Sequence, residues 1–123
     1  MSKYIWNPFL IDGYKFDIRI YVVITSIMPL RIFIYEEGLV RFATEKYFIG
    51  QPFKKNRFMH LTNYSLNKNS KNFIPNRDPF LDNIGSKWSL GALKSFLDKN
   101  VNYIILKNTI KINIEYKHER NFG

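Results

Sequence analysis

Polar and apolar residues alternate along residues 14–20 and run into an apolar segment at residues 20–24, which together predict a β-strand over residues 14–26. Successive side chains of a strand point to opposite faces, so Lys15, Asp17 and Arg19 share one face. The apolar residues between them, Phe16 and Ile18, point to the other face together with Ile20. Alternating charges backed by apolar side chains predict a binding face on a rigid sheet.

Two further strands are predicted downstream, at residues 30–35 and 39–44. Met28-Pro29 predicts the first turn and Glu36-Glu37-Gly38 the second. Short turns favour pairing between neighbouring strands, so residues 14–44 are expected to form an antiparallel meander. Residues 4–11 read as a short extended segment that Asn7-Pro8 interrupts.

The second half of the chain predicts a long surface loop followed by a helix. Residues 67–83 are rich in Asn, Lys, Ser and Pro, and Ser89 is a good N-cap for a helix that runs to about Asp98 and stops near Asn100. The tail is ambiguous, because residues 110–116 alternate as in a strand whereas Val101, Ile104, Ile105 and Asn108 have helical spacing. The fold class expected is α+β, an antiparallel sheet with helices.

Composition narrows the class of protein. A chain of 123 residues, 46% hydrophobic and 17% aromatic, can bury the core of a single domain. It has no cysteine, which excludes disulfides and thiolate metal sites, and its apolar runs are strand-sized, which disfavours a membrane protein. A net charge of +9 attracts nucleic acid, anionic lipid, nucleotide phosphates or acidic polypeptide tails, and charge alone does not choose among them.

Candidate chemistry is confined to cations and hydroxyl or amide groups. His60 and His118 are far apart and have no acidic cluster at ligand spacing, so no metal site is expected from this chain alone. Arginine suits bidentate recognition of carboxylate or phosphate, and an ionised Asp17 between two cations could accept hydrogen bonds from a ribose. The candidate binding residues are Lys15, Arg19, Arg41, Thr62, Asn63 and Lys87.

Four blocks of sequence resemble one family. They are NPFLIDGYKFDIR at 7–19, LRIFIYEEGLVRFATE at 30–45, MHLTNYSLNK at 59–68 and GSKWSL at 85–90. In this order they resemble the tubulin–tyrosine ligase-like family, and Tyr64-Ser65 with Lys87 resemble its glutamate-adding (tubulin polyglutamylase) branch. The resemblance implies a partial ATP-grasp fold. It also implies an ATP-dependent ligase that activates a carboxylate as an acyl phosphate and joins it to an amino acid.

The resemblance assigns a nucleotide role to two groups of residues. Lys3, Tyr4 and Ile5 are similar to the hinge that meets the adenine, although Ser2 replaces the glutamine that usually precedes the lysine. Lys15 and Asp17 match positions for the nucleoside and its ribose. Thr62 and Asn63 match nucleotide contacts.

The remaining matches concern the transferred groups. Arg19 matches a position near the transferring phosphate and the acceptor carboxylate, and Arg41 matches one that binds the incoming amino acid or the acyl-phosphate intermediate. Tyr64, Ser65 and Lys87 match residues around free glutamate. The acceptor implied is a glutamate in the acidic C-terminal tail of tubulin on microtubules, which suits the net charge of +9.

Two parts of the family pattern are not matched. The Mg²⁺ ligands of the family lie in a downstream strand pair that has no counterpart here, so they are expected outside this chain. The upstream nucleotide-binding lobe of the family also has no counterpart here. Residues 1–100 therefore resemble the central part of a catalytic domain and 101–123 a divergent tail, and the chain alone is expected to be inactive. A cytoplasmic location at the cytoskeleton, cilium or basal body is implied.

Two other classes of function compete with the ligase. One is a non-catalytic tubulin-binding or microtubule-binding module that uses Arg19, Arg41 and the basic residues 54–57. The other is a nucleic-acid binder, which needs exposed aromatic rings on the charged face. The alternation places Phe16 and Ile18 on the opposite face, so neither a nucleic acid nor a membrane is expected as a partner.

Overall fold

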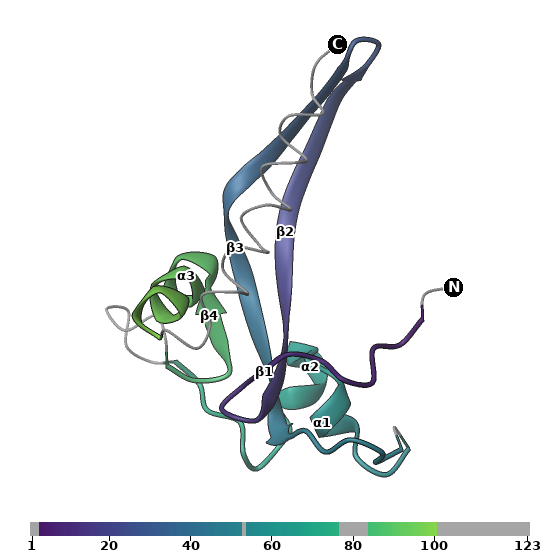
Figure 1. Ribbon diagram of the computed structural model, residues 1–123, viewed down its shortest axis with the longest axis vertical. Coiled ribbons are helices and arrows are strands. Elements are labelled where there is room, and N and C mark those ends of the chain that lie inside the picture. Colours follow the sequence, from purple (N-terminus) through teal and green to yellow (C-terminus); the bar gives the residue numbers. More distant parts are fainter. Residues whose placement is uncertain (1–2, 53, 77–83, 101–123) are drawn as a thin grey trace.

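The computed structural model describes residues 3–52, 54–76 and 84–100, and within them a single antiparallel sheet with helices (Figure 1). The strands follow the order β1-β2-β3-β4. Their bounds are β1 Leu10–Ile11, β2 Tyr14–Ile27, β3 Leu30–Lys46 and β4 Lys87–Ser89. The helices are α1 Arg57–His60, α2 Tyr64–Asn67 and α3 Leu90–Lys99. The predicted α+β class with an antiparallel sheet is confirmed.

Strands β2 and β3 form a long hairpin whose distal half projects away from the helices (Figure 1). Ile27 pairs with Leu30 across Met28-Pro29, which confirms the predicted turn there. At the other end, Asp12 and Gly13 join β1 to β2 with φ angles of 52° and 83°. Positive φ at both positions is what a two-residue type I′ hairpin turn needs, and Asp-Gly is a favoured pair for it.

The turn predicted at Glu36-Glu37-Gly38 is wrong, because β3 runs through it without a break. Ile20 pairs with Gly38 and Val22 with Ile34, so the residues between them form a bulge in one strand. A Cβ on Gly38 would lie 2.7 Å from the carbonyl oxygen of Arg19, so this glycine permits close approach of the two backbones. The turn-like composition of this segment therefore marks a bulge.

Glu37 in this bulge ties β3 to the start of α3. Its Oε1 accepts hydrogen bonds from the backbone N–H groups of Gly91, at 3.0 Å, and Gly38, at 3.1 Å. A carboxylate is favourable beside the exposed N–H groups at a helix N-terminus. Glu37 of the predicted turn thus contributes to docking the helix.

The core lies on the face of the sheet that α3 covers. Ile18, Val40 and Trp88 are in register across β2, β3 and β4. Leu90, Leu93 and Leu97 of α3 pack onto this face, as the apolar stripe of the helix predicts. The helix begins at the predicted cap, where Ser89 Oγ accepts from Ala92 N–H at 3.0 Å, and ends at Asn100.

The predicted loop at 67–83 is described as far as Asn76. Its Ile74 carbonyl accepts a hydrogen bond from Ser86 N–H at 3.0 Å, which fastens the loop beside β4. The interpretations of residues 101–123 lie outside the described residues. No helix among those described is long and apolar enough to cross a membrane.

Candidate functional site

Three charged side chains form a row across the sheet. Asp17 of β2 pairs in register with Arg41 of β3, and Arg41 pairs with Lys87 of β4. The adjacent register row of the core points to the opposite face, so the alternation of each strand sets these charges on the face away from α3. Neighbouring strands lie about 4.8 Å apart, which puts the Arg41 and Lys87 cations within reach of one small anion.

Asp17 and Arg41 make a two-pronged ion pair. Arg41 Nε donates to Asp17 Oδ1 at 3.1 Å, and Arg41 Nη2 donates to Asp17 Oδ2. The side chains keep 36% and 25% of their surface exposed, so the pair is open to a ligand. This hydrogen bonding to Asp17 raises the pKa of Arg41 and keeps the guanidinium charged.

Lys15 lies on the same face and is held by α1. Its Nζ donates to the backbone carbonyl of His60 at 3.0 Å and lies 6.0 Å from the centre of the Tyr4 ring. Partial burial lowers the pKa of Lys15, and the nearby Asp17 carboxylate opposes that shift. An ammonium group that is only partly hydrated is well suited to contact a phosphate or a nucleoside.

Tyr4 brings the N-terminal segment to the same place. Its hydroxyl is 2.6 Å from Nδ1 of the buried His60, and its ring packs edge-on against Trp6. Burial, followed by the interaction with Tyr47, raises the pKa of Tyr4 to about 12. Lys3 and Ile5, the other residues assigned to the adenine hinge, are exposed on either side of it.

Thr62 and Asn63 are presented by a buried residue that the sequence reasoning missed, Asn67. Its Oδ1 accepts from the backbone N–H of Thr44 at 3.2 Å and the hydroxyl of Thr44 at 2.8 Å. Its Nδ2 donates to the carbonyls of Leu61 at 2.8 Å and Asn63 at 2.9 Å. Asn67 therefore fastens the 61–63 segment to β3. The only sign of this role in the sequence was the position of Asn67 within the motif block at residues 59–68.

Three other residues predicted for the site make contacts with residues outside the row of Asp17, Arg41 and Lys87. The Arg19 guanidinium stacks over the Tyr21 ring at 5.3 Å. The Tyr64 ring contacts Phe73 at 5.9 Å, and Ser65 accepts a hydrogen bond from Asn69 through its carbonyl. Tyr64 and Ser65 are both exposed on α2. Their contacts described above are with Phe73 and Asn69, not with Arg41 or Lys87.

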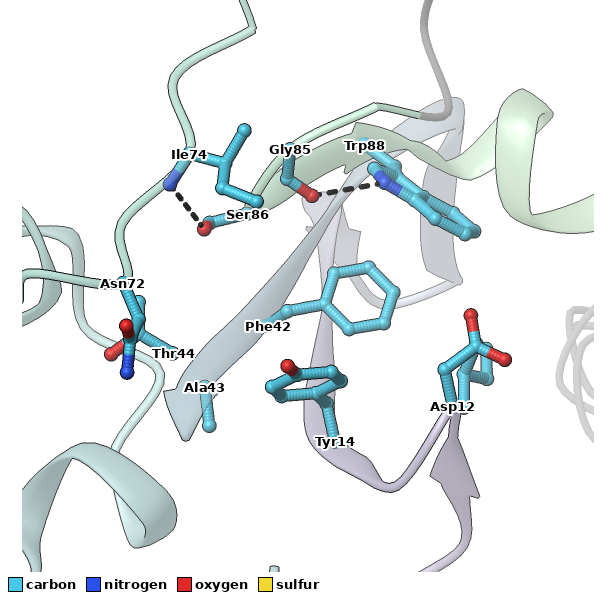
Figure 2. Close-up of a pocket in the computed structure, with 11 residues that line it drawn as sticks. Asp12, Tyr14, Phe42, Ala43, Thr44, Asn72, Ile74, Gly85, Ser86 and Trp88 are labelled. Atoms are coloured by element: carbon cyan, nitrogen blue, oxygen red, sulfur yellow. Dashed lines mark hydrogen bonds between the residues drawn. The ribbon is translucent and has the colours of Figure 1, made fainter. Parts of the chain in front are cut away.

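A small cavity of about 170 Å³ lies elsewhere, between β1, the start of β4 and the 72–74 loop (Figure 2). The rings of Tyr14, Phe42 and Trp88 line it, and Trp88 Nε1 donates to the Gly85 carbonyl at 3.2 Å. Phe42 and Trp88 belong to the core, so this cavity is on the α3 face. None of the residues predicted to bind a ligand lines it.

The charged face can bind anions but offers few metal ligands. Within residues 3–52, 54–76 and 84–100, no three His, Cys, Asp or Glu side chains gather closely enough to hold a metal ion. The chemistry available is recognition: a carboxylate that can accept from hydroxyls, and cations that can bind phosphate or carboxylate.

Comparison with known proteins identifies the family. The profile described as "Tubulin-tyrosine ligase family" matches residues 1–118. Tubulin polyglutamylase TTLL5 of Mus musculus is 52% identical over 97 residues, which are 79% of this chain and 7% of that protein. Tubulin monoglutamylase TTLL4 of Homo sapiens is 46% identical over 112 residues, covering 90% of this chain and 9% of that protein.

A third relative is more distant. Tubulin polyglutamylase ttll-5 of Caenorhabditis elegans is 42% identical over 99 residues, covering 80% of this chain and 14% of that protein. The chain thus spans a small part of the length of each of these relatives. With a profile match over nearly its whole length, it belongs to the tubulin-tyrosine ligase family.

Proposed function

We propose that this chain forms part of an ATP-dependent ligase that adds glutamate to glutamate side chains in the acidic tails of tubulin. The observation that carries the proposal is the row of Asp17, Arg41 and Lys87, with Lys15 on the same face. The names of the relatives, which are polyglutamylases and a monoglutamylase, support glutamate as the added group.

Two steps account for the reaction. A carboxylate oxygen of the acceptor attacks the γ-phosphorus of ATP, which forms an acyl phosphate and releases ADP. The amine of free glutamate then attacks the acyl carbon, the amide bond forms, phosphate leaves, and the amine gives up a proton. Negative charge develops on phosphate and carboxylate oxygens in both steps, so fixed cations lower the barrier.

The nucleotide half of the site would use Tyr4, Lys15 and Asp17, with Thr62 and Asn63 close by. A carboxylate such as Asp17 can accept hydrogen bonds from two ribose hydroxyls, and the partly dehydrated Lys15 ammonium suits the nucleoside end. The hydrogen bond from Lys15 to the His60 carbonyl supports a site in which β2 and the 59–63 segment lie side by side. Lys3 and Ile5 would flank the adenine.

The transfer half would use Arg41 and Lys87, with Arg19 near the transferring phosphate. The Arg41 guanidinium already holds a carboxylate in two-pronged geometry, that of Asp17, which supports a role in binding the carboxylate of glutamate or of the intermediate. Lys87 is next in register and would pair with a second carboxylate. Tyr64 and Ser65 would have to approach from α2.

Other parts of the proposal rest on the family resemblance. Mg²⁺ would be held by acidic residues outside these 123 positions, in an ATP-grasp domain. The basic surface, with a net charge of +9, would steer acidic tails on microtubules toward the site. A cytoplasmic location at the cytoskeleton or cilium follows from that substrate.

A chimaera tests the proposal. The 97 residues of this chain that align with the mouse relative would replace the matching stretch of that protein. ATP-dependent incorporation of labelled glutamate into tubulin would then be measured. We expect activity in the chimaera and its loss in Arg41→Ala, with Arg31→Ala as a control for the same change of charge on the distal hairpin. Full activity of the Arg41→Ala chimaera would contradict the proposed role. Tubulin binding without transfer, in a chimaera that folds, would favour the binding-module alternative.

A further inference from the structure

His60 is a buried polar residue that contacts Lys15 of the charged face. Its ring is 2% exposed and lies edge-on to the rings of Tyr4, Trp6 and Tyr47, at centroid distances of 5.7, 6.4 and 5.5 Å. No role was assigned to it from the sequence beyond its place in the 59–68 block. Because burying a polar ring costs free energy unless it is hydrogen bonded, its partners matter.

The hydrogen-bond partners select one tautomer for a neutral ring. Nε2 lies 2.9 Å from the carbonyl oxygen of Gln51, which can only accept, so Nε2 carries the hydrogen. In the neutral ring Nδ1 is then an acceptor, and the Tyr4 hydroxyl oxygen, 2.6 Å away, is the donor. In this tautomer both ring nitrogens have a hydrogen-bond partner.

The backbone of the same residue holds the second element. The His60 carbonyl accepts from Lys15 Nζ at 3.0 Å, and Lys15 belongs to β2. One residue therefore joins the N-terminal segment at Tyr4, the 47–51 loop at Gln51 and the sheet at Lys15. Thr62 and Asn63 follow along the chain after Leu61.

We propose that His60 is a positioning residue for the nucleotide, because its ring fixes Tyr4 and its carbonyl fixes Lys15. The inference rests on the proposed ATP site: Tyr4 stands at the adenine end and Lys15 nearer the ribose. His60 itself is too buried to touch the ligand. Its contribution is to hold Tyr4 and Lys15 at a fixed separation. This preorganisation lowers the entropy cost of ordering the two side chains when the nucleotide binds.

The variants separate the two nitrogens of the ring. His60→Gln places an amide near the Nε2 position and removes the acceptor for Tyr4. His60→Asn places its amide oxygen near Nδ1 and keeps that acceptor. Tyr4→Phe removes the donor alone. Ser89→Ala, which removes the N-cap of α3 on the opposite face, is a control for general destabilisation.

Calorimetry on the full 123-residue chain would compare MgATP with magnesium tripolyphosphate, which lacks the adenosine. We expect Tyr4→Phe and His60→Gln to weaken ATP binding by about fivefold to tenfold and tripolyphosphate binding by less than about twofold. His60→Asn should bind ATP nearly as the wild type does. The double variant of Tyr4→Phe and His60→Gln should lose no more than either alone, because both remove one interaction.

Three results would overturn the inference. ATP affinity of His60→Gln and Tyr4→Phe equal to that of Ser89→Ala would leave His60 with a structural role only. Independent, additive losses would show that Tyr4 and His60 act separately. Nitrogen NMR shifts of the wild-type ring give a third readout, which requires no variant to fold. Shifts that place the hydrogen on Nδ1 would rule out the hydrogen bond from the Tyr4 hydroxyl on which the proposal depends.

A wild-type chain that binds neither ligand would instead contradict the proposed nucleotide site itself, and this inference with it. Binding of tripolyphosphate with no preference for ATP would uphold an anion site and overturn the role of Tyr4 and His60. The two failures are therefore distinguishable in the same set of titrations.

Discussion

Asp17 and Arg41, which the family resemblance assigns to two different ligands, hold each other in a two-pronged ion pair across β2 and β3. Asp17 would bind the ribose and Arg41 a carboxylate. Each side chain has its hydrogen-bonding edge turned toward the other. A ligand that draws one of them away therefore changes what the other can do, so the two halves of the proposed site are expected to be coupled.

Replacing Asp17 tests this coupling. In Asp17→Asn the guanidinium of Arg41 loses the carboxylate that neutralises it, so a triglutamate peptide should bind about threefold to tenfold tighter at low salt. ATP should bind more weakly, because the amide is a poorer acceptor for ribose hydroxyls. Fluorescence anisotropy measures both. Asp12→Asn, the same change of charge in the β1–β2 turn, is the control, and weaker binding of the peptide to Asp17→Asn would refute the coupling.

Asn67 is expected to be essential for stability and for presenting Thr62 and Asn63. Asn67→Ala leaves the Thr44 N–H and two carbonyls without their buried partner, which should lower the free energy of unfolding by about 2 to 4 kcal/mol. Urea denaturation measures the loss. Asn69→Ala, which removes one exposed hydrogen bond of 3.3 Å, should change stability by less than about 0.5 kcal/mol. Equal effects of the two changes would contradict the role of Asn67.

Gly38 is expected to tolerate no side chain. In Gly38→Ala the new Cβ would lie 2.7 Å from the Arg19 carbonyl oxygen, so the hairpin must shift, at a cost of about 1 to 3 kcal/mol. Gly91→Ala is the matched change, because its Cβ would meet no backbone atom: its nearest neighbours would be the carboxylate of Glu37, at 3.2 Å, and Ser89 Oγ, at 3.6 Å. Thermal unfolding should show a clear loss for Gly38→Ala and little change for Gly91→Ala. A reversed order would argue against the bulge.

The free energy of unfolding should fall at high pH because the Tyr4 hydroxyl loses its proton. Its pKa is about 12 in the folded chain against an ordinary 10, so the folded state holds this proton more tightly than the unfolded state. The contribution is complete below pH 10 and is lost as the pH rises toward 12. Between pH 9 and 11.5, wild type should lose about 1 to 2 kcal/mol more than Tyr4→Phe does, as measured by urea denaturation. Parallel losses would mean that Tyr4 titrates normally.

The strand pattern predicted the sheet because alternation depends only on local geometry. The charged face of β2, the turn at Met28-Pro29 and the Ser89 cap each follow from residues close in sequence. The bulge at Glu36-Glu37-Gly38 does not. Its composition is that of a turn, and only the approach of Arg19 and of α3 converts it into a continuous strand.

The long-range contacts of the site could not be predicted from the sequence either. Tyr4 and His60 are 56 positions apart, and Asn67 reaches back 23 positions to Thr44. No periodicity encodes such pairs, because each depends on how loops fold against the sheet. The residue types were visible as polar positions in the motif blocks, whereas their partners became known only in three dimensions.

The most direct test of the central claim maps ligands onto the chain by NMR. Backbone amide shifts would be followed while MgATP, and then a triglutamate peptide, is added to the full 123-residue chain. ATP is predicted to shift amides at Tyr4, Lys15, Asp17 and residues 60–63, and the peptide those at Arg41 and Lys87. Shifts confined to the Phe42 and Trp88 side of the sheet, or no shifts with either ligand, would contradict the assignment of the charged face as the ATP and carboxylate site.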